Sequence, residues 1–161
     1  LDKLRPRLAR SGLSNVYPVV IAHERDDRIQ RLAGKLDRVL VDAPCTGTGT
    51  LRRNPDLKWR LHETDVPKLA VQQASILKSA ATLLKPGGRL VYATCSLLAA
   101  ENRDIVTRFL SERSDFTLHD ATEVLSHQQV NFNPGAGNPM LELFPHRHGT
   151  DGFFAAVMQR D

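Results

Sequence analysis

The sequence has few of the features that mark secreted, membrane-embedded or disulfide-stabilised proteins. It contains only two cysteines in 161 residues, too few for a disulfide scaffold, so a reducing cytoplasm is the expected compartment. No hydrophobic run approaches the roughly 20 residues of a membrane span. The first residues, LDKLRPRLAR, lack the apolar segment of a signal peptide. The chain is therefore expected to be cytoplasmic, with no membrane contact.

Motifs for metal ions and nucleotide phosphates are also missing. The two cysteines lie 50 positions apart and no Cys-x-x-Cys pair exists, so no zinc site is predicted. The glycines of PCTGTG at 44–49 complete neither G-x-x-x-x-G-K-[ST] nor G-x-G-x-x-G. They are interpreted as giving the loop freedom to turn sharply. The histidines of HRH at 146–148 are interpreted as an exposed hairpin tip, with weak metal binding as the alternative.

Positive charge is concentrated in the first part of the chain. Residues 1–60 carry 13 Lys and Arg against 7 Asp and Glu, whereas residues 61–161 carry 9 against 11. A basic region is the usual footprint of a polyanionic partner such as a nucleic acid. The net charge of +4 is modest for a nucleic-acid-binding protein, and ordinary solvation of surface lysine and arginine is the alternative. Charge alone leaves both interpretations open.

The hydrophobic pattern predicts strands that alternate with helices. Strands are expected at 15–22, 36–41, 89–94 and 116–118, and a terminal hairpin at 140–144 and 153–159. Helices are expected at 2–11, 64–84 and 101–112, and polar loops at 42–60 and 119–140. The run LDRVLV at 36–41 is typical of a buried parallel strand. Residues 1–161 are therefore predicted to form a single α/β domain with a mainly parallel sheet.

Residues with reactive side chains follow two of these strands. Asp42 and Cys45 come directly after strand 36–41, and Cys95 comes directly after strand 89–94. Ligands of open α/β sheets bind at the carboxyl ends of the strands. If the two strands are neighbours, two thiols and one carboxylate meet in one pocket.

Two thiols and a carboxylate suit covalent chemistry on a pyrimidine. A thiolate can add to carbon 6 of cytosine, which makes carbon 5 able to attack a methyl donor, and a second thiol can assist release of the product. Asp42, expected to be buried among apolar residues, can orient the base. The alternatives are that both cysteines pack as small hydrophobic residues, or that they form a disulfide, which is less expected in the cytoplasm.

Three segments resemble one known family. DAPCTGTGTLRRNPDLKW at 42–59, LKPGGRLVYATCSLLAAEN at 84–102 and DGFFAAVMQR at 151–160 are similar to the Sun/Fmu (RsmB-like) family of S-adenosylmethionine-dependent ribosomal RNA cytosine-5 methyltransferases. The resemblance implies a Rossmann-like class I methyltransferase sheet. It implies that Cys95 attacks carbon 6, that Cys45 assists product release, and that Asp42 lies between cofactor and base.

The resemblance also predicts what this chain lacks. The family's glycine-rich cofactor motif and its ribose-binding acidic residue belong before Leu1, so residues 1–161 correspond to the C-terminal portion of the catalytic domain. The two absent strands belong between 15–22 and 36–41, and weak cofactor binding with little or no activity is expected. At the family's adenine-binding acidic position, spacing from Asp42 gives His23, with Glu24 or Asp26 as alternatives.

The expected partner is RNA, and protein partners are not predicted. Its phosphates are expected to bind a cluster that follows the Cys45 loop, namely Arg52, Arg53, Lys58 and Arg60. Trp59 is interpreted as a core or loop anchor, with a base-stacking platform as the alternative. One rival function is a non-catalytic RNA-binding or assembly module; another is an amino-group methyltransferase, which uses an Asp-Pro-Pro-aromatic loop. A cysteine hydrolase is the remotest alternative, because no histidine is placed by sequence to activate either thiol.

Overall fold

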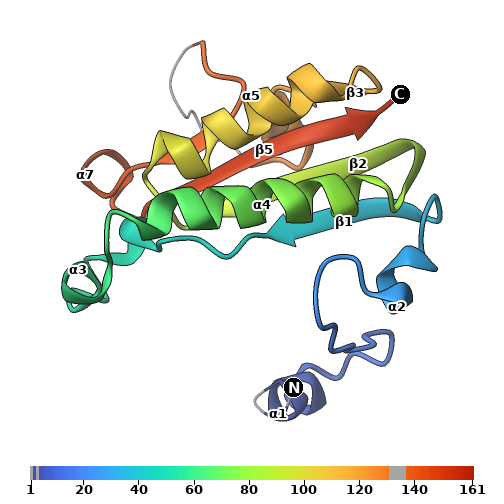
Figure 1. Ribbon diagram of the computed structural model, residues 1–161, viewed down its shortest axis with the longest axis horizontal. Coiled ribbons are helices and arrows are strands. Elements are labelled where there is room, and N and C mark those ends of the chain that lie inside the picture. The colour runs from blue at the N-terminus through green and yellow to red at the C-terminus, as the bar shows by residue number, and fades with distance from the viewer. Residues whose placement is uncertain (1, 3, 131–136) are drawn as a thin grey trace.

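The computed structural model describes residues 2, 4–130 and 137–161, and residues 131–136 of the predicted loop 119–140 lie outside the described part. A mixed sheet runs through the molecule (Figure 1). Its strands are β1 (Leu36–Asp42), β2 (Leu84–Thr94), β3 (Phe116–His119), β4 (Leu141–Leu143) and β5 (Phe153–Arg160). The order is β1-β2-β5-β3, with β4 also paired to β5.

The predicted α/β class is confirmed, but the described sheet is not mainly parallel. Only β1 and β2 pair in parallel, and β5 runs antiparallel to β2, β3 and β4. The expected terminal hairpin is present, with Glu142 opposite Phe154, and its connection contains the short helix α7 (Pro145–His148).

The predicted strand at 15–22 is wrong. These residues belong to no helix and to no ladder, and Val16, Tyr17, Val19 and Val20 are exposed. An extended segment becomes a strand only when a neighbour takes up its N–H and C=O groups. No described strand lies next to this segment, and Pro18 has no N–H to offer. The β-branched residues of this segment favour a strand, but no strand described in this chain pairs with it.

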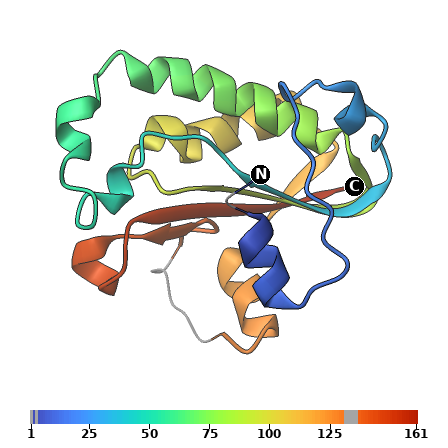
Figure 2. The same cartoon turned by 90° about the horizontal axis from the view of Figure 1, so that it is seen from below.

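Two helices cover one face of the sheet, and α6 (Ala121–His127) lies on the other (Figure 2). The covering helices are α4 (Asp65–Ala81) and α5 (Arg103–Glu112), which match the predicted helices closely. Their apolar faces meet β2 and β5 in a core that includes Leu77, Leu90, Tyr92, Val106, Phe109 and Phe154. This packing holds β1 and β2 rigidly side by side.

The remaining elements are short. Helix α1 (Arg5–Ser11) ends at Gly12, whose left-handed backbone (φ 67°) stops it as expected. The others are α2 (Asp27–Gln30), the 3-10 turn η1 (Thr48–Thr50), α3 (Leu57–Arg60) and the 3-10 turn η2 (Ala99–Glu101). In the described part of the chain, no helix is both long and apolar enough to cross a membrane.

Strand β1 is parallel to β2, as predicted, but it is not buried. It lies at the end of the sheet, and Leu40 is 68% exposed while Val41 is buried. An edge strand has one side without a neighbour, so its apolar residues are only partly covered. The outer edge of β1 is consequently open.

Candidate active site

The two cysteines meet at the carboxyl ends of β1 and β2. These strands are parallel neighbours, with Asp42 opposite Ala93, so the loops that follow them leave from the same edge of the sheet. The Cys45 and Cys95 sulfur atoms lie 3.4 Å apart. Both are half-buried free thiols, at hydrogen-bond distance and well beyond the ~2.05 Å of a disulfide bond. The predicted convergence of the thiols is confirmed.

The two thiols have different surroundings. Burial, followed by the hydrogen bond with Cys95, raises the pKa of Cys45 from 9.0 to about 12. At neutral pH Cys45 therefore keeps its proton and can donate it in a hydrogen bond to the Cys95 sulfur. The thiolate is the nucleophilic form of cysteine, so the raised pKa makes Cys45 a poor nucleophile at neutral pH.

Two glycines bring the surrounding loops together. The Gly49 N–H donates to the Cys95 carbonyl at 2.9 Å, and the Gly152 N–H donates to the Gly49 carbonyl at 2.8 Å. A Cβ at Gly49 would lie 2.2 Å from the Gly152 oxygen, which no side chain can tolerate. Gly47 turns the same loop with φ 71°. The glycines of PCTGTG thus serve backbone geometry, as the sequence indicates.

One buried carboxyl group links both cysteine loops. Glu101, at the end of η2, is completely buried, and its two oxygens accept four hydrogen bonds. The donors are the Thr46 N–H (2.9 Å), the Thr46 hydroxyl (2.5 Å), the Ser96 hydroxyl (2.5 Å) and the Gln73 amide (3.0 Å). Thr46 follows Cys45, and Ser96 follows Cys95. Glu101 therefore sets the separation of the two sulfur atoms.

A second layer of hydrogen bonds holds Glu101 and the Cys95 loop in place. Burial holds the pKa of Tyr92 above its ordinary value, and its hydroxyl donates to the Glu101 carbonyl at 2.7 Å. Asn102 contacts the Thr94 hydroxyl and donates to the Ser96 carbonyl. Sequence reasoning missed this network. The one sequence feature that could have indicated this network is Gln73, a polar residue on the apolar face of the predicted helix 64–84.

Asp42 is not buried as expected, but exposed at the end of β1. The reason is the open edge of β1, which leaves this carboxylate uncovered on one side. Asp42 lines a largely apolar groove of about 280 Å³, together with Ile21, Leu40, Pro44 and Ile76. The groove adjoins the Cys45 loop through Pro44. A carboxylate thus lines an apolar groove that extends to the residue before Cys45.

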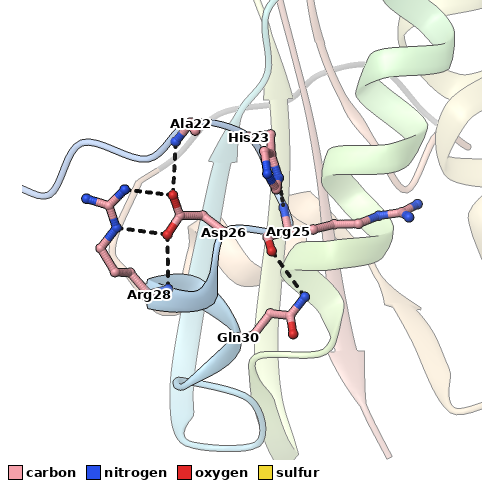
Figure 3. Close-up of polar contacts among 6 residues, drawn as sticks. All are labelled: Ala22, His23, Arg25, Asp26, Arg28 and Gln30. Carbon is pink, nitrogen blue, oxygen red and sulfur yellow. Dashed lines mark hydrogen bonds and ion pairs between the residues drawn. The ribbon is translucent and has the colours of Figure 1, made fainter.

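The segment predicted to contact adenine precedes α2. Figure 3 shows Asp26 bound to the Arg28 guanidinium and to the N–H groups of Ala22 and Arg28. These hydrogen bonds hold the pKa of Asp26 well below its ordinary value. Glu24 is also engaged, because it accepts a 2.6 Å hydrogen bond from Ser75 that lowers its pKa.

His23 is the least committed of the three candidates. Its Nδ1 accepts the Arg25 N–H at 3.1 Å (Figure 3), and the side chain is otherwise exposed. This contact leaves Nε2 as the ring nitrogen that can meet a ligand. His23 borders an open polar depression with Arg25 and Arg28, whereas Glu24, not His23, lines the Asp42 groove. The structure therefore does not bring His23 and Asp42 into one cavity.

The four basic residues predicted to bind RNA are exposed; Arg52 and Arg53 lie in the turn that follows η1, and Lys58 and Arg60 lie in α3. Arg53 pairs with Asp151 at 3.0 Å and Arg60 with Asp56 at 2.6 Å. The interpretation of Trp59 as an anchor is wrong, because its side chain is 78% exposed. Its position in α3, which has no buried residue, directs it away from the core. No group of three or more His, Cys, Asp or Glu that could hold a metal ion occurs in residues 2, 4–130 and 137–161.

Comparison with known proteins gives consistent matches along the chain. Residues 1–159 match the family model described as 16S rRNA methyltransferase RsmB/F. The probable ribosomal RNA small subunit methyltransferase B of Bacillus subtilis (strain 168) is 40% identical over 166 residues, covering 99% of this chain and 36% of the relative.

Two solved structures share the fold. One, titled "Crystal Structure of PH0851", has a TM-score of 0.87 and 36% identity, covering 99% of this chain and 34% of that one. The other, NSun6 from Pyrococcus horikoshii with SFG, has a TM-score of 0.80 and 28% identity, covering 99% of this chain and 38% of that one. The predicted Rossmann-like methyltransferase sheet is thereby confirmed, and the chain spans about a third of the length of these relatives. By its sequence and its fold, the chain belongs to the RsmB/F family of 16S rRNA methyltransferases.

Proposed function

We propose that residues 1–161 are the C-terminal part of a catalytic domain that methylates carbon 5 of a cytosine in ribosomal RNA. The reaction proceeds through a covalent bond between Cys95 and carbon 6 of the base. The observation that carries this proposal is the 3.4 Å contact between two free thiols at the carboxyl ends of adjacent parallel strands. Membership of a 16S rRNA methyltransferase family supports RNA as the substrate.

The proposed methyl donor is S-adenosylmethionine, whose analogue SFG is present in a related structure. When bound, it supplies an electrophilic methyl group. The groove along β1 fits one side of such a ligand, because it combines apolar walls with the Asp42 carboxylate, which suits a cationic nucleoside derivative. Asp42 would hold the junction of cofactor and base. His23 would meet the adenine end through Nε2, since its Nδ1 is already engaged.

The two cysteines have different roles in the proposed reaction. The Cys95 sulfur forms a bond to carbon 6, which makes carbon 5 nucleophilic toward the methyl group. Carbon 5 would take the methyl group as the bond between that group and the donor sulfur breaks. The proton on carbon 5 would then pass to solvent water, and the electron pair it leaves would restore the double bond between carbons 5 and 6 as the bond to Cys95 breaks. Cys45, held as a thiol by its raised pKa, donates a hydrogen bond to the Cys95 sulfur. That hydrogen bond stabilises Cys95 as a thiolate, both before attack and as the leaving group.

The proposed RNA contacts are electrostatic. Arg52, Arg53, Lys58 and Arg60 follow the Cys45 loop on an exposed surface. Cationic side chains of this kind position a nucleic acid through its phosphates and carry no sequence information themselves. They would hold the RNA strand while its cytosine enters the space beside Cys95.

The test uses a chimera in which residues 1–161 replace the matching part of the Bacillus subtilis relative. Wild type, Cys95→Ala and Cys45→Ala are incubated with 16S rRNA and methyl-labelled S-adenosylmethionine, and products are separated on a denaturing gel. We expect Cys95→Ala to abolish methylation and Cys45→Ala to accumulate a covalent RNA–protein adduct. Normal methylation by both variants would show that the thiols are structural, and an inactive chimera that still binds RNA would favour a binding module.

A further inference from the structure

Trp59 is a large aromatic side chain that does not contribute to the hydrophobic core. It is 78% exposed, and Lys58 is the one cation or aromatic ring found against its indole among the described residues, with the ammonium 4.8 Å from the ring centroid. The backbone that presents it is fixed, because Leu57, Trp59 and Leu61 donate hydrogen bonds to Asn54, Asp56 and Leu57. Trp59 is thus exposed on an ordered helical turn.

The turn that carries Trp59 adjoins the thiols. A Cβ placed on Gly47 would lie 3.7 Å from Leu57 Cδ2 and 4.0 Å from Cys95 Sγ. Leu57 therefore lies next to the loop that encloses Cys95, and Trp59 follows it by two residues. Figures 1 and 2 both place α3 beyond the carboxyl ends of β1 and β2, at the same end of the molecule as α7.

The charge at this end of the molecule points to the kind of partner. Among the described residues, Arg52, Lys58 and Arg147 of α7 are exposed and make no ion pair. Exposed cations without an acidic partner suit a polyanionic ligand, whose phosphates supply the missing negative charge. An exposed aromatic ring beside unpaired cations is the arrangement by which proteins hold single-stranded nucleic acids, because every base has a face that can stack.

We propose that Trp59 stacks on an unpaired base of the RNA next to the reacting cytosine, while Arg52, Lys58 and Arg147 bind the neighbouring phosphates. Lys58 lies over one face of the indole and leaves the other for the base. This inference rests on the proposed function only in taking RNA as the substrate. It predicts a preference for single-stranded over double-stranded RNA, since a paired base must first be unpaired and unstacked before it can meet the ring.

The experiment uses the 161-residue chain, in which Trp59 is the single tryptophan, so its intrinsic fluorescence reports this site alone. Titration with a short single-stranded RNA should quench the fluorescence to saturation, and the matching duplex should quench it much less. Affinity is measured separately by anisotropy of a fluorescein-labelled RNA. We expect Trp59→Ala to weaken binding on the order of tenfold, with Trp59→Phe intermediate. Lys58→Ala and Arg147→Ala should each lower the salt dependence by about one counterion.

The matched control is Val71→Ala, an equally exposed apolar position (71%) on the surface of α4, which should bind RNA like wild type. Circular dichroism confirms that each variant is folded. Absence of RNA binding, unchanged Trp59 fluorescence at saturating RNA, or wild-type affinity of Trp59→Ala would overturn the proposal. Failure of the methylation chemistry is separable from failure of the stacking site, because RNA binding and fluorescence quenching are measured without S-adenosylmethionine and need no methyl transfer.

Discussion

Substitution of the buried Glu101 tests whether its carboxyl group holds the two cysteine loops together. Glu101→Ala removes the acceptor of four hydrogen bonds. The Thr46 and Ser96 hydroxyls lie 3.3 Å apart and can then donate to one another, and Gln73 keeps its 2.8 Å bond to the Pro44 carbonyl. The Thr46 N–H has no other acceptor. One buried donor without a partner costs about 1–3 kcal/mol.

Together with weakened hydroxyl bonds and the cavity left by the side chain, the expected loss is about 3 kcal/mol. For a chain of this length that corresponds to a fall of roughly 10 °C in Tm. Glu101→Gln should cost about 1 kcal/mol or less, because its oxygen can still accept from Thr46 N–H and Gln73. Its new NH2 group can donate to the two hydroxyls, which accept as readily as they donate.

The assay is thermal unfolding followed by circular dichroism, with Asp104→Ala as the matched control, since Asp104 is an exposed acidic residue in the first turn of α5. A second measurement follows the sulfur pair itself. Diamide should cross-link Cys45 to Cys95 at similar rates in wild type and Glu101→Gln, and more slowly in folded Glu101→Ala. A wild-type Tm for Glu101→Ala, or equal losses for the Ala and Gln variants, would refute this account of the site.

Three further outcomes follow from the same geometry. Gly49→Ala places a Cβ against the Gly152 carbonyl and should destabilise the chain by about 2 kcal/mol or more, measured by urea unfolding; an unchanged midpoint would contradict the close contact. Because the pKa of Cys45 is raised to about 12, iodoacetamide should modify Cys45 slowly between pH 7 and 10, as followed by peptide mass spectrometry. Rapid labelling of Cys45 in this pH range would contradict the raised pKa. The 161-residue chain should bind S-adenosylmethionine more weakly than low-micromolar by calorimetry, because the outer edge of β1 is open; tight binding would show that the groove is already complete.

Local patterns in the sequence were sufficient for much of the fold. The 3.6-residue period of 64–84 predicts α4, and the apolar runs that end at Asp42 and Thr94 predict β1 and β2. The meeting of Cys45 and Cys95 was predicted on the condition that the two strands are neighbours, because parallel neighbours bring their carboxyl ends to one edge, and the structure supplies that pairing. These features depend on residues close together in the chain, or on a rule of topology that holds for every open α/β sheet.

Tertiary structure decided what depends on partners distant in the sequence. Residues 15–22 have strand composition, but no neighbour pairs with them, so the segment is not a strand. Asp42 and Trp59 are exposed because β1 is an edge strand and α3 buries none of its residues. Glu101 looks like an ordinary first residue of a surface helix, yet it binds Thr46, 55 positions earlier. The hydrophobic periodicity of the sequence indicates which face of a helix or strand is apolar. The groups that pack against that face are determined only when the whole chain folds.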